Sequence, residues 1–216
     1  MLLLISLFLA TFTSATQVVK RAPDGVPDYV VKYAPMVYLQ SEDPWKPSDI
    51  ATQLTNTEPR VDSNVVSEQP MTLDNLTFLN DLGGENVYLT SKVKPYSDPV
   101  PAFLFGVLPN KEGETEGAVS STIIVNDHGD GTVDAFYFYF YAFDRGALSI
   151  GNHVGDWEHS MIRFVNETPS ALWYSQHSSG QAFKYSAVQK YGDGGDNLRV
   201  SGDYGESDDS PPQADT

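Results

Sequence analysis

The run from Ala135 to Phe143 constrains the fold more than any other part of the chain. It reads Ala-Phe-Tyr-Phe-Tyr-Phe-Tyr-Ala-Phe, so every position is apolar or aromatic. A strand with one face in water alternates apolar and polar residues, whereas a strand covered on both faces does not. The run therefore predicts a buried strand whose rings belong to the core.

Turn residues and β-branched residues surround this strand. The segment 126–131, Asn-Asp-His-Gly-Asp-Gly, is typical of a hairpin turn between a strand at 118–125 and a strand at 132–143. Further strands are expected at 86–93, 156–165, 171–177 and 183–188.

Only two short helices are expected. One begins at a cap in Ser48–Asp49 and runs through Leu54, and the other begins at Thr72 and ends at Leu82, before Gly83. Many short strands with few helices predict an all-β fold, namely an antiparallel β-sandwich with a few short helices.

The N-terminal residues have the pattern of a secretory leader. Residues 1–15 are a short apolar stretch that ends in small residues, as a signal peptide does; the alternative is an apolar segment that stays uncleaved. Residues 16–21 end in the dibasic pair Lys20–Arg21, which indicates a propeptide. We therefore expect a protein of the secretory pathway, with no transmembrane segment in the mature chain.

Composition separates a domain from a tail. Residues 22–191 carry the strand pattern and are expected to form the β-sandwich domain. Residues 192–216 contain six Asp, one Glu, one Arg and five Gly, with few apolar residues. Such a segment buries too little apolar surface to offset the entropy of ordering it, so we expect a disordered acidic tail.

Charge and cysteine content exclude several classes of protein. The formal net charge is −16, so nucleic acid and anionic membranes would repel the chain and are not expected as electrostatically bound partners. The chain contains no cysteine, which excludes a disulfide framework and a thiolate metal site. Sequons at Asn75 and Asn166 predict N-glycosylation in a secretory context.

The densest group of chemically active residues lies in the run 151–159, Gly-Asn-His-Val-Gly-Asp-Trp-Glu-His. If Asp156 begins a strand, alternation places Asp156 and Glu158 on one face of the sheet. Trp157 and His159 then lie on the other face. Two carboxylates on one face repel each other unless a cation or a proton lies between them.

His153 precedes these acids on a segment that Gly151 and Gly155 allow to bend. Its imidazole and the carboxylates of Asp156 and Glu158 could therefore converge on a divalent cation such as Ca²⁺ or Mg²⁺. Without a metal, the acid pair would suit general acid–base work. The alternative is a hydrogen-bonded network under a sheet edge, with no chemistry.

Two more histidines are candidates for a pocket beside this cluster. His159 lines such a pocket or is a histidine at the edge of the core. His177 ends a predicted strand and reaches the same pocket only if that strand is adjacent.

Several motifs, in order, resemble the fungal vacuolar protein sorting-associated protein 62 family. They are 33–35, 41–45, 47–50, 126–136, 151–159 and 173–177. The resemblance covers roughly residues 28–191. It implies vacuolar protein sorting, or an accessory role outside the cell or in the vacuolar lumen, with no established catalytic activity. The family pattern continues past Tyr191 into a further β-rich segment, so the resemblance implies that the C-terminal part of the family fold is missing.

A more distant similarity, over some 15 residues, is to necrosis-inducing secreted cytolysins, whose signature is Gly-His-Arg-His-Asp-Trp-Glu. His153, Asp156 and Glu158 match three positions of that signature, while Gly155 stands where the second histidine is expected. The resemblance implies a divalent cation held by these residues and an upstream aspartate, for which Asp144 is the candidate. The alternative for Asp144 is a solvated strand end.

Three functions are therefore expected as alternatives. The first is a secreted or vacuolar, non-enzymatic accessory protein with a divalent-cation site. The second is a cytolysin-like module that binds a glycolipid or glycan through the cation. The third is a hydrolase in which Asp156 and Glu158 activate water.

Overall fold

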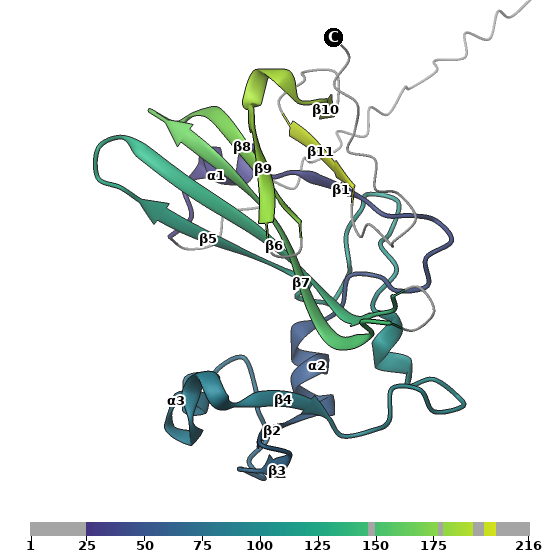
Figure 1. Cartoon of the computed structure of the whole chain (residues 1–216). Coiled ribbons are helices and arrows are strands. Elements are labelled where there is room, and N and C mark those ends of the chain that lie inside the picture. Colours follow the sequence, from purple (N-terminus) through teal and green to yellow (C-terminus); the bar gives the residue numbers. More distant parts are fainter. Residues whose placement is uncertain (1–24, 147–149, 177–178, 192–196, 202–216) are drawn as a thin grey trace, which may run out of the picture.

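Figure 1 shows the fold in a computed structural model, which describes residues 25–146, 150–176, 179–191 and 197–201. The predicted signal peptide and propeptide lie outside these residues, as do His177 and most of the predicted tail. The strands are β1 (Met36–Tyr38), β2 (Thr57–Val61), β3 (Asn64–Val65), β4 (Tyr88–Ser91), β5 (Ser121–Asp127), β6 (Thr132–Asp144), β7 (His153–Val165), β8 (Thr168–Gln176), β9 (Ser179–Lys184), β10 (Lys190–Tyr191) and β11 (Asn197–Ser201). The helical elements are α1 (Asp28–Lys32), α2 (Ile50–Asn56), α3 (Phe78–Leu82), η1 (Gly84–Asn86), η2 (Ala102–Phe105) and η4 (Tyr185–Ala187).

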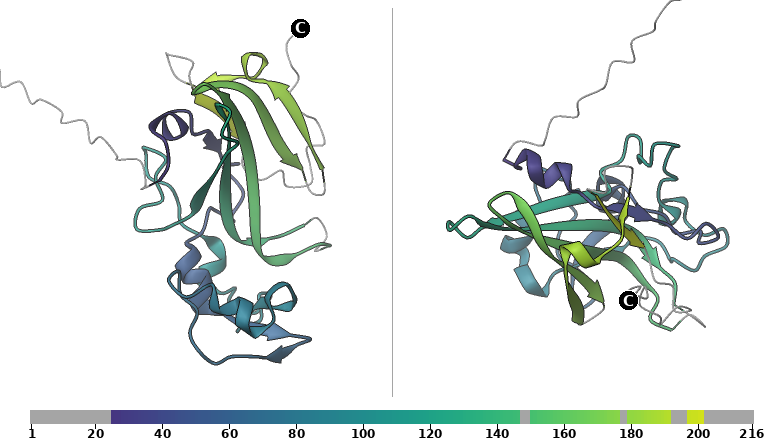
Figure 2. Two further views of the ribbon diagram at one scale, coloured as in Figure 1. Left: turned by 90° about the vertical axis from the view of Figure 1, so that its left-hand side faces the viewer. Right: turned by 90° about the horizontal axis from the view of Figure 1, so that it is seen from above.

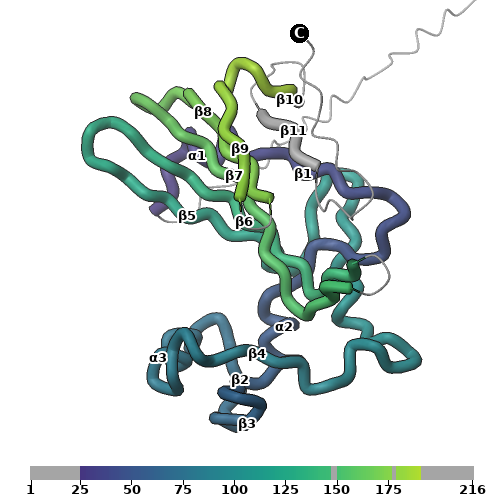
Figure 3. The backbone as a smooth tube through the Cα atoms, viewed as in Figure 1, coloured from purple at the N-terminus to yellow at the C-terminus, as the bar shows by residue number. Residues whose placement is uncertain are grey.

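The prediction of an all-β, mostly antiparallel fold with a few short helices is confirmed. The largest sheet has five strands in the order β5-β6-β7-β8-β9, and every pair in it is antiparallel. Two three-stranded sheets accompany it, β3-β2-β4 and β1-β11-β10. Figure 3 shows the β3-β2-β4 sheet at one end of the molecule, with α2 between it and the large sheet.

The predicted α2 forms because its cap is in place. Asp49 accepts a hydrogen bond from the Thr52 backbone N–H at 2.8 Å, which satisfies one of the free donors at the helix start. The same carboxylate accepts from the Val119 N–H at 3.0 Å and so ties α2 to the segment that leads into β5. The second predicted helix is shorter than expected, because regular helix begins only at Phe78, although it ends before Gly83 as predicted.

The aromatic run lies in β6 and is mostly buried, as expected. Its buried members are Ala135, Tyr137, Phe140, Tyr141, Ala142 and Phe143. Phe136, Phe138 and Tyr139 are half-buried. The strand is therefore fully covered near its C-terminal end and only partly covered in its middle.

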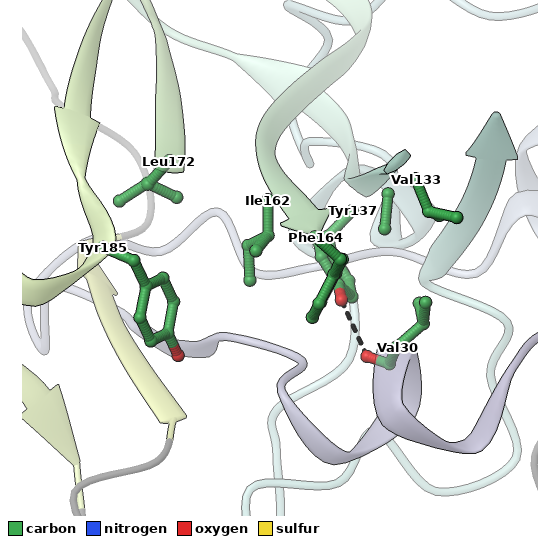
Figure 4. Close-up of a cluster of buried hydrophobic side chains, with 8 residues drawn as sticks. Val30, Val133, Tyr137, Ile162, Phe164, Leu172 and Tyr185 are labelled. Carbon is green, nitrogen blue, oxygen red and sulfur yellow. Dashed lines mark hydrogen bonds between the residues drawn. The ribbon is translucent and has the colours of Figure 1, made fainter. Parts of the chain in front are cut away.

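One core cluster packs α1 against a single face of the large sheet. It combines Val30 of α1 with side chains from β6, β7, β8 and η4, namely Val133, Ala135, Tyr137, Ile162, Phe164, Leu172 and Tyr185. The Tyr137 hydroxyl donates to the Val30 carbonyl at 2.7 Å, as the dashed line in Figure 4 shows. Figure 2 shows α1 beside the sheet in two further views.

Residues 197–201 depart from the predicted disordered tail. They form β11, which pairs in parallel with β1 and antiparallel with β10. The sequence Asn-Leu-Arg-Val-Ser alternates polar and apolar residues, a strand pattern that the acidic composition of the whole segment concealed. The folded part of the chain therefore extends beyond Tyr191.

Gly106 permits a close contact that joins η2 to the start of α2. Its φ is +70°, and a Cβ atom there would lie 2.0 Å from the Lys46 carbonyl oxygen. The same Cβ atom would lie 2.7 Å from Ser48 Oγ, which accepts a hydrogen bond from the Ala142 N–H of β6. Only glycine fits at this position.

We predict that Gly106→Ala destabilises the protein more than Gly117→Ala. Gly117 has a similar φ of +72° but open space around it, so Gly117→Ala reports the cost of a positive φ without a steric clash. The clash with Lys46 adds about 1–3 kcal/mol to the loss in Gly106→Ala alone. Urea unfolding of both variants measures the difference, and equal losses would contradict the contact.

Candidate functional site

The predicted site lies at one end of the β6–β7 pair, where the register brings its residues close. Asp144 is opposite His153, Tyr141 is opposite Asp156, and Tyr139 is opposite Glu158. β7 begins at His153, three residues before the predicted start at Asp156. The histidine therefore belongs to the strand itself and not to a preceding turn.

Gly155 allows His153 to reach Asp156. Strict alternation would place side chains at 153 and 156 on opposite faces of the sheet. Gly155 has a φ of +82°, a left-handed conformation that interrupts the alternation. His153 Nε2 consequently lies 3.3 Å from Asp156 Oδ1.

The other ring nitrogen of His153 faces two acceptors. Nδ1 lies 2.8 Å from the Gly151 carbonyl oxygen and 3.8 Å from Asp144 Oδ2. The nearer contact is a hydrogen bond in which Nδ1–H donates to the carbonyl. The two carboxylates therefore approach opposite edges of one imidazole, and all three side chains keep partial access to solvent.

The two acids favour a proton on His153. Partial burial lowers the pKa of the imidazole. The hydrogen bonds to Gly151 and Asp156, together with the charges of Asp156 and Asp144, raise this pKa by more than burial lowers it. The net result is a pKa above the ordinary value for histidine. Burial, followed by the charge of Asp156, raises the pKa of the Asp144 carboxyl against the opposing effect of His153.

The cluster is not an assembled metal centre. Within the part of the chain that the structure describes, no group of three histidine, aspartate or glutamate residues is arranged to hold a metal ion. Nε2 and Asp156 face each other, but Asp144 approaches the Nδ1 edge, which is engaged with Gly151. Glu158 is half-buried opposite Tyr139, two residues farther along β7.

The predicted division of faces along β7 agrees with the ring contacts. Trp157 packs on Phe140 with centroids 4.8 Å apart, and His159 stacks on Phe138 at 4.7 Å. His159 thus lies among aromatic rings on the face opposite Asp156 and Glu158, and it does not line a pocket with them. Burial lowers the pKa of its imidazole.

The two predicted glycosylation residues have different surroundings. Asn75 is half-buried, accepting from the Thr72 N–H and donating to the Pro70 carbonyl. Asn166 is exposed in the β7–β8 turn with a φ of +48°. Glycosylation itself stays a prediction at both positions.

Sequence reasoning missed a second polar cluster, centred on Asp134 of β6. Its side chain is nearly buried and accepts two hydrogen bonds from Arg163, both at 2.7 Å. His128 Nε2 lies 2.9 Å from the same carboxylate. The hydrogen bonds from Arg163, stronger than the opposing burial and supported by His128, hold the pKa of Asp134 below its ordinary value.

We predict that Asp134→Asn lowers the free energy of unfolding by on the order of 1–3 kcal/mol, because it breaks charge-assisted hydrogen bonds at a nearly buried position. The lowered pKa means that this contribution is present above the unfolded pKa and is lost as the pH falls through the folded pKa. Chemical denaturation across acidic pH measures it. Arg163→Gln is the matched control. If the variant with both changes loses as much unfolding free energy as the two single variants added together, Asp134 and Arg163 are not coupled.

We predict opposite pKa shifts for two histidines of β7. His153 should titrate above the ordinary value and His159 below it, as followed by NMR of the ring protons. Because the folded pKa of His153 is raised, its contribution is present below the unfolded pKa and is lost as the pH rises through the folded pKa. The half-exposed ring limits the effect to about 1 kcal/mol or less. Asp156→Asn should lower the His153 pKa and leave that of His159 unchanged; the reverse result would contradict the contact.

Residues 141–204 match the family model for vacuolar protein sorting-associated protein 62. A vacuolar protein sorting-associated protein of Saccharomyces cerevisiae, TDA6, is 36% identical over 189 residues, which are 79% of this chain. Vacuolar protein sorting-associated protein 62 of the same yeast is 33% identical over 184 residues, 77% of this chain. The chain belongs to the vacuolar protein sorting-associated protein 62 family.

The family match includes the site and part of the predicted tail. It begins at Tyr141, beside the Asp144–His153–Asp156 cluster, and it extends past Tyr191 to residue 204, farther than the motifs indicated. The chain spans about 40% of the length of TDA6 and 39% of the length of yeast vacuolar protein sorting-associated protein 62.

Among solved structures, the chain is similar to necrosis and ethylene inducing protein 2 from the causal agent of witches' broom disease of cocoa. The TM-score is 0.44 at 10% identity, over 85% of this chain and 65% of that protein.

In the described parts of the chain, every helix is too short or too polar to cross a membrane.

Proposed function

We propose that this protein is a non-enzymatic accessory protein of vacuolar sorting, which works in the secretory pathway or the vacuolar lumen and binds a divalent cation at His153. The family membership supports the sorting role. The arrangement of His153 between Asp144 and Asp156 supports the cation site, and it is the observation on which the proposal depends.

The hydrogen bond of His153 to Gly151 favours metal binding at the other nitrogen. Histidines that bind metals commonly donate their second N–H to a backbone carbonyl, which fixes the tautomer and the ring orientation. With Nδ1–H directed to Gly151, a neutral His153 presents its lone pair at Nε2, toward Asp156 Oδ1. A cation there would take the place of the proton that Nε2 carries when His153 is protonated.

Asp144 would complete the donor set by turning its carboxylate. Two carboxylates and one imidazole offer charge and oxygen ligands to Ca²⁺ or Mg²⁺, and the partly exposed position leaves room for water ligands. Proton and cation compete for the same place, so cation binding should strengthen as the pH rises through the pKa of His153.

We predict that Ca²⁺ or Mg²⁺ raises the melting temperature, and more at pH 8 than at pH 5.5. The shift should disappear in Asp156→Asn and shrink in Asp144→Asn, because each variant removes a ligand and part of the attracting charge. Asp130→Asn, which removes an exposed turn carboxylate, is the matched control and should keep the shift. Equal shifts in Asp156→Asn and Asp130→Asn, or no shift at millimolar metal, would exclude the site.

The glycolipid-binding module and the hydrolase stay predictions. Dye release from glycolipid-bearing vesicles tests the first, and turnover of a glycoside or ester with a bell-shaped pH profile tests the second. In the hydrolase, Glu158→Gln should abolish turnover.

A further inference from the structure

The five-stranded sheet has two outer edges, β5 and β9. Within the described residues, no strand pairs with the outer side of either one. An edge strand presents free N–H and C=O groups that can pair with another chain, and proteins usually protect it with charged residues, proline or a bulge. The two edges can be compared on this criterion.

β9 is protected and β5 is not. β9 carries an exposed lysine, Lys184, beside exposed polar residues such as Gln181. β5 reads Ser-Thr-Ile-Ile-Val-Asn-Asp, with no lysine, arginine, proline or glycine, and its charged residue, Asp127, stands at the end. It pairs with β6 at seven consecutive positions without a bulge. It is thus a bulge-free, β-branched and nearly uncharged edge.

The middle of β5 is also apolar on its exposed face. Ile124 is 52% exposed, at the centre of the strand. It lies opposite Phe136 of β6, and Phe136 belongs to a group of neighbouring rings with Phe138 and His159. Another strand added beside β5 would cover Ile124 and extend this apolar surface.

We propose that a second copy of this chain pairs antiparallel with β5 along this edge, about a two-fold axis at Ile124. In this register Ile124 is opposite its own copy, Ile123 is opposite Val125, and Thr122 is opposite Asn126. Asp127 is then opposite Ser121, so no acid faces another acid, even though the whole chain carries −16. The pairing joins two five-stranded sheets into one continuous sheet.

The self-complementary sequence favours a second copy over another partner. A two-fold axis on one strand needs a segment that is compatible with its own reverse, and β5 has β-branched residues on both sides of Ile124 and small polar residues beyond them. The net charge opposes association over longer distances, so dimerisation should strengthen with salt, which screens that repulsion.

The absence of cysteine permits a direct test of the register. Directly opposed residues of an antiparallel pair have Cα atoms about 4.5–5.5 Å apart, within the range that a disulfide spans. Ile124→Cys in the full chain should therefore form a disulfide-linked dimer under mild oxidation. Val165→Cys, at a position 44% exposed at the end of β7, is the matched control and should stay largely monomeric.

Ile123→Cys reports the register. In the proposed register residue 123 is opposite residue 125 of the second copy. The two cysteines at position 123 are then diagonal neighbours about 7–8 Å apart, so this variant should form far less disulfide than Ile124→Cys. Equal linking of Ile124→Cys and Val165→Cys would overturn the proposal. Stronger linking at 123 than at 124 would overturn the register.

Sedimentation equilibrium provides a readout without cysteines. The unmodified chain should form a dimer whose dissociation constant falls as salt is raised. Ile124→Lys places two positive charges opposite each other across the two-fold axis. It should raise the dissociation constant of the dimer about tenfold or more, with an unchanged circular dichroism spectrum. A monomer at every salt concentration, or open-ended oligomers, would overturn the two-fold pairing, and Val165→Lys should leave the dimer intact.

Discussion

The register between β6 and β7 is the constraint on which the rest of the structure depends. Twelve residue pairs connect the two strands, from Thr132 opposite Val165 to Asp144 opposite His153. A shift by one residue would exchange the two faces of either strand and expose its core side chains. The pairing therefore fixes three things together: the core under α1, the row of aromatic rings on the other face, and the group of acids and imidazole at the end.

The core stabilises this register from one face. Ile162 and Phe164 of β7 are fully buried, and so is Val30 of α1. The Tyr137 hydroxyl, which would be costly to bury alone, finds its acceptor in the Val30 carbonyl. That bond fixes the short α1 helix at a single position on the sheet, since five residues of helix have little stability of their own.

The sequence pattern predicted those structural features that depend only on residues close together in the chain. The alternation of Asp156 and Glu158 with Trp157 and His159 follows from strand geometry, and the rings of Phe138 and Phe140 occupy the predicted face. The cap at Asp49 and the stop at Gly83 are likewise local signals. These features can be predicted from a few consecutive residues.

What the sequence did not reveal depends on distant residues or on one dihedral angle. Asp134 and Arg163 lie 29 residues apart, and only the β6–β7 register pairs them. β11 pairs with β1 across most of the chain, which composition could not indicate. His153 meets Asp156 because the backbone at Gly155 is left-handed, and a sequence shows that a glycine is present but not which conformation it adopts.

Gly155 also makes the geometry of the site depend on one residue, whereas the sheet depends on the rest of the strand. A Cβ atom there would lie 3.3 Å from Gln53 Nε2, and the left-handed φ disfavours every other residue. Beyond this glycine, substitutions within the strand can adjust packing without moving the imidazole. A family that keeps the glycine can therefore vary the acids and the ring beside it, and so acquire or lose a ligand, while the β6–β7 pairing and the core under α1 stay the same.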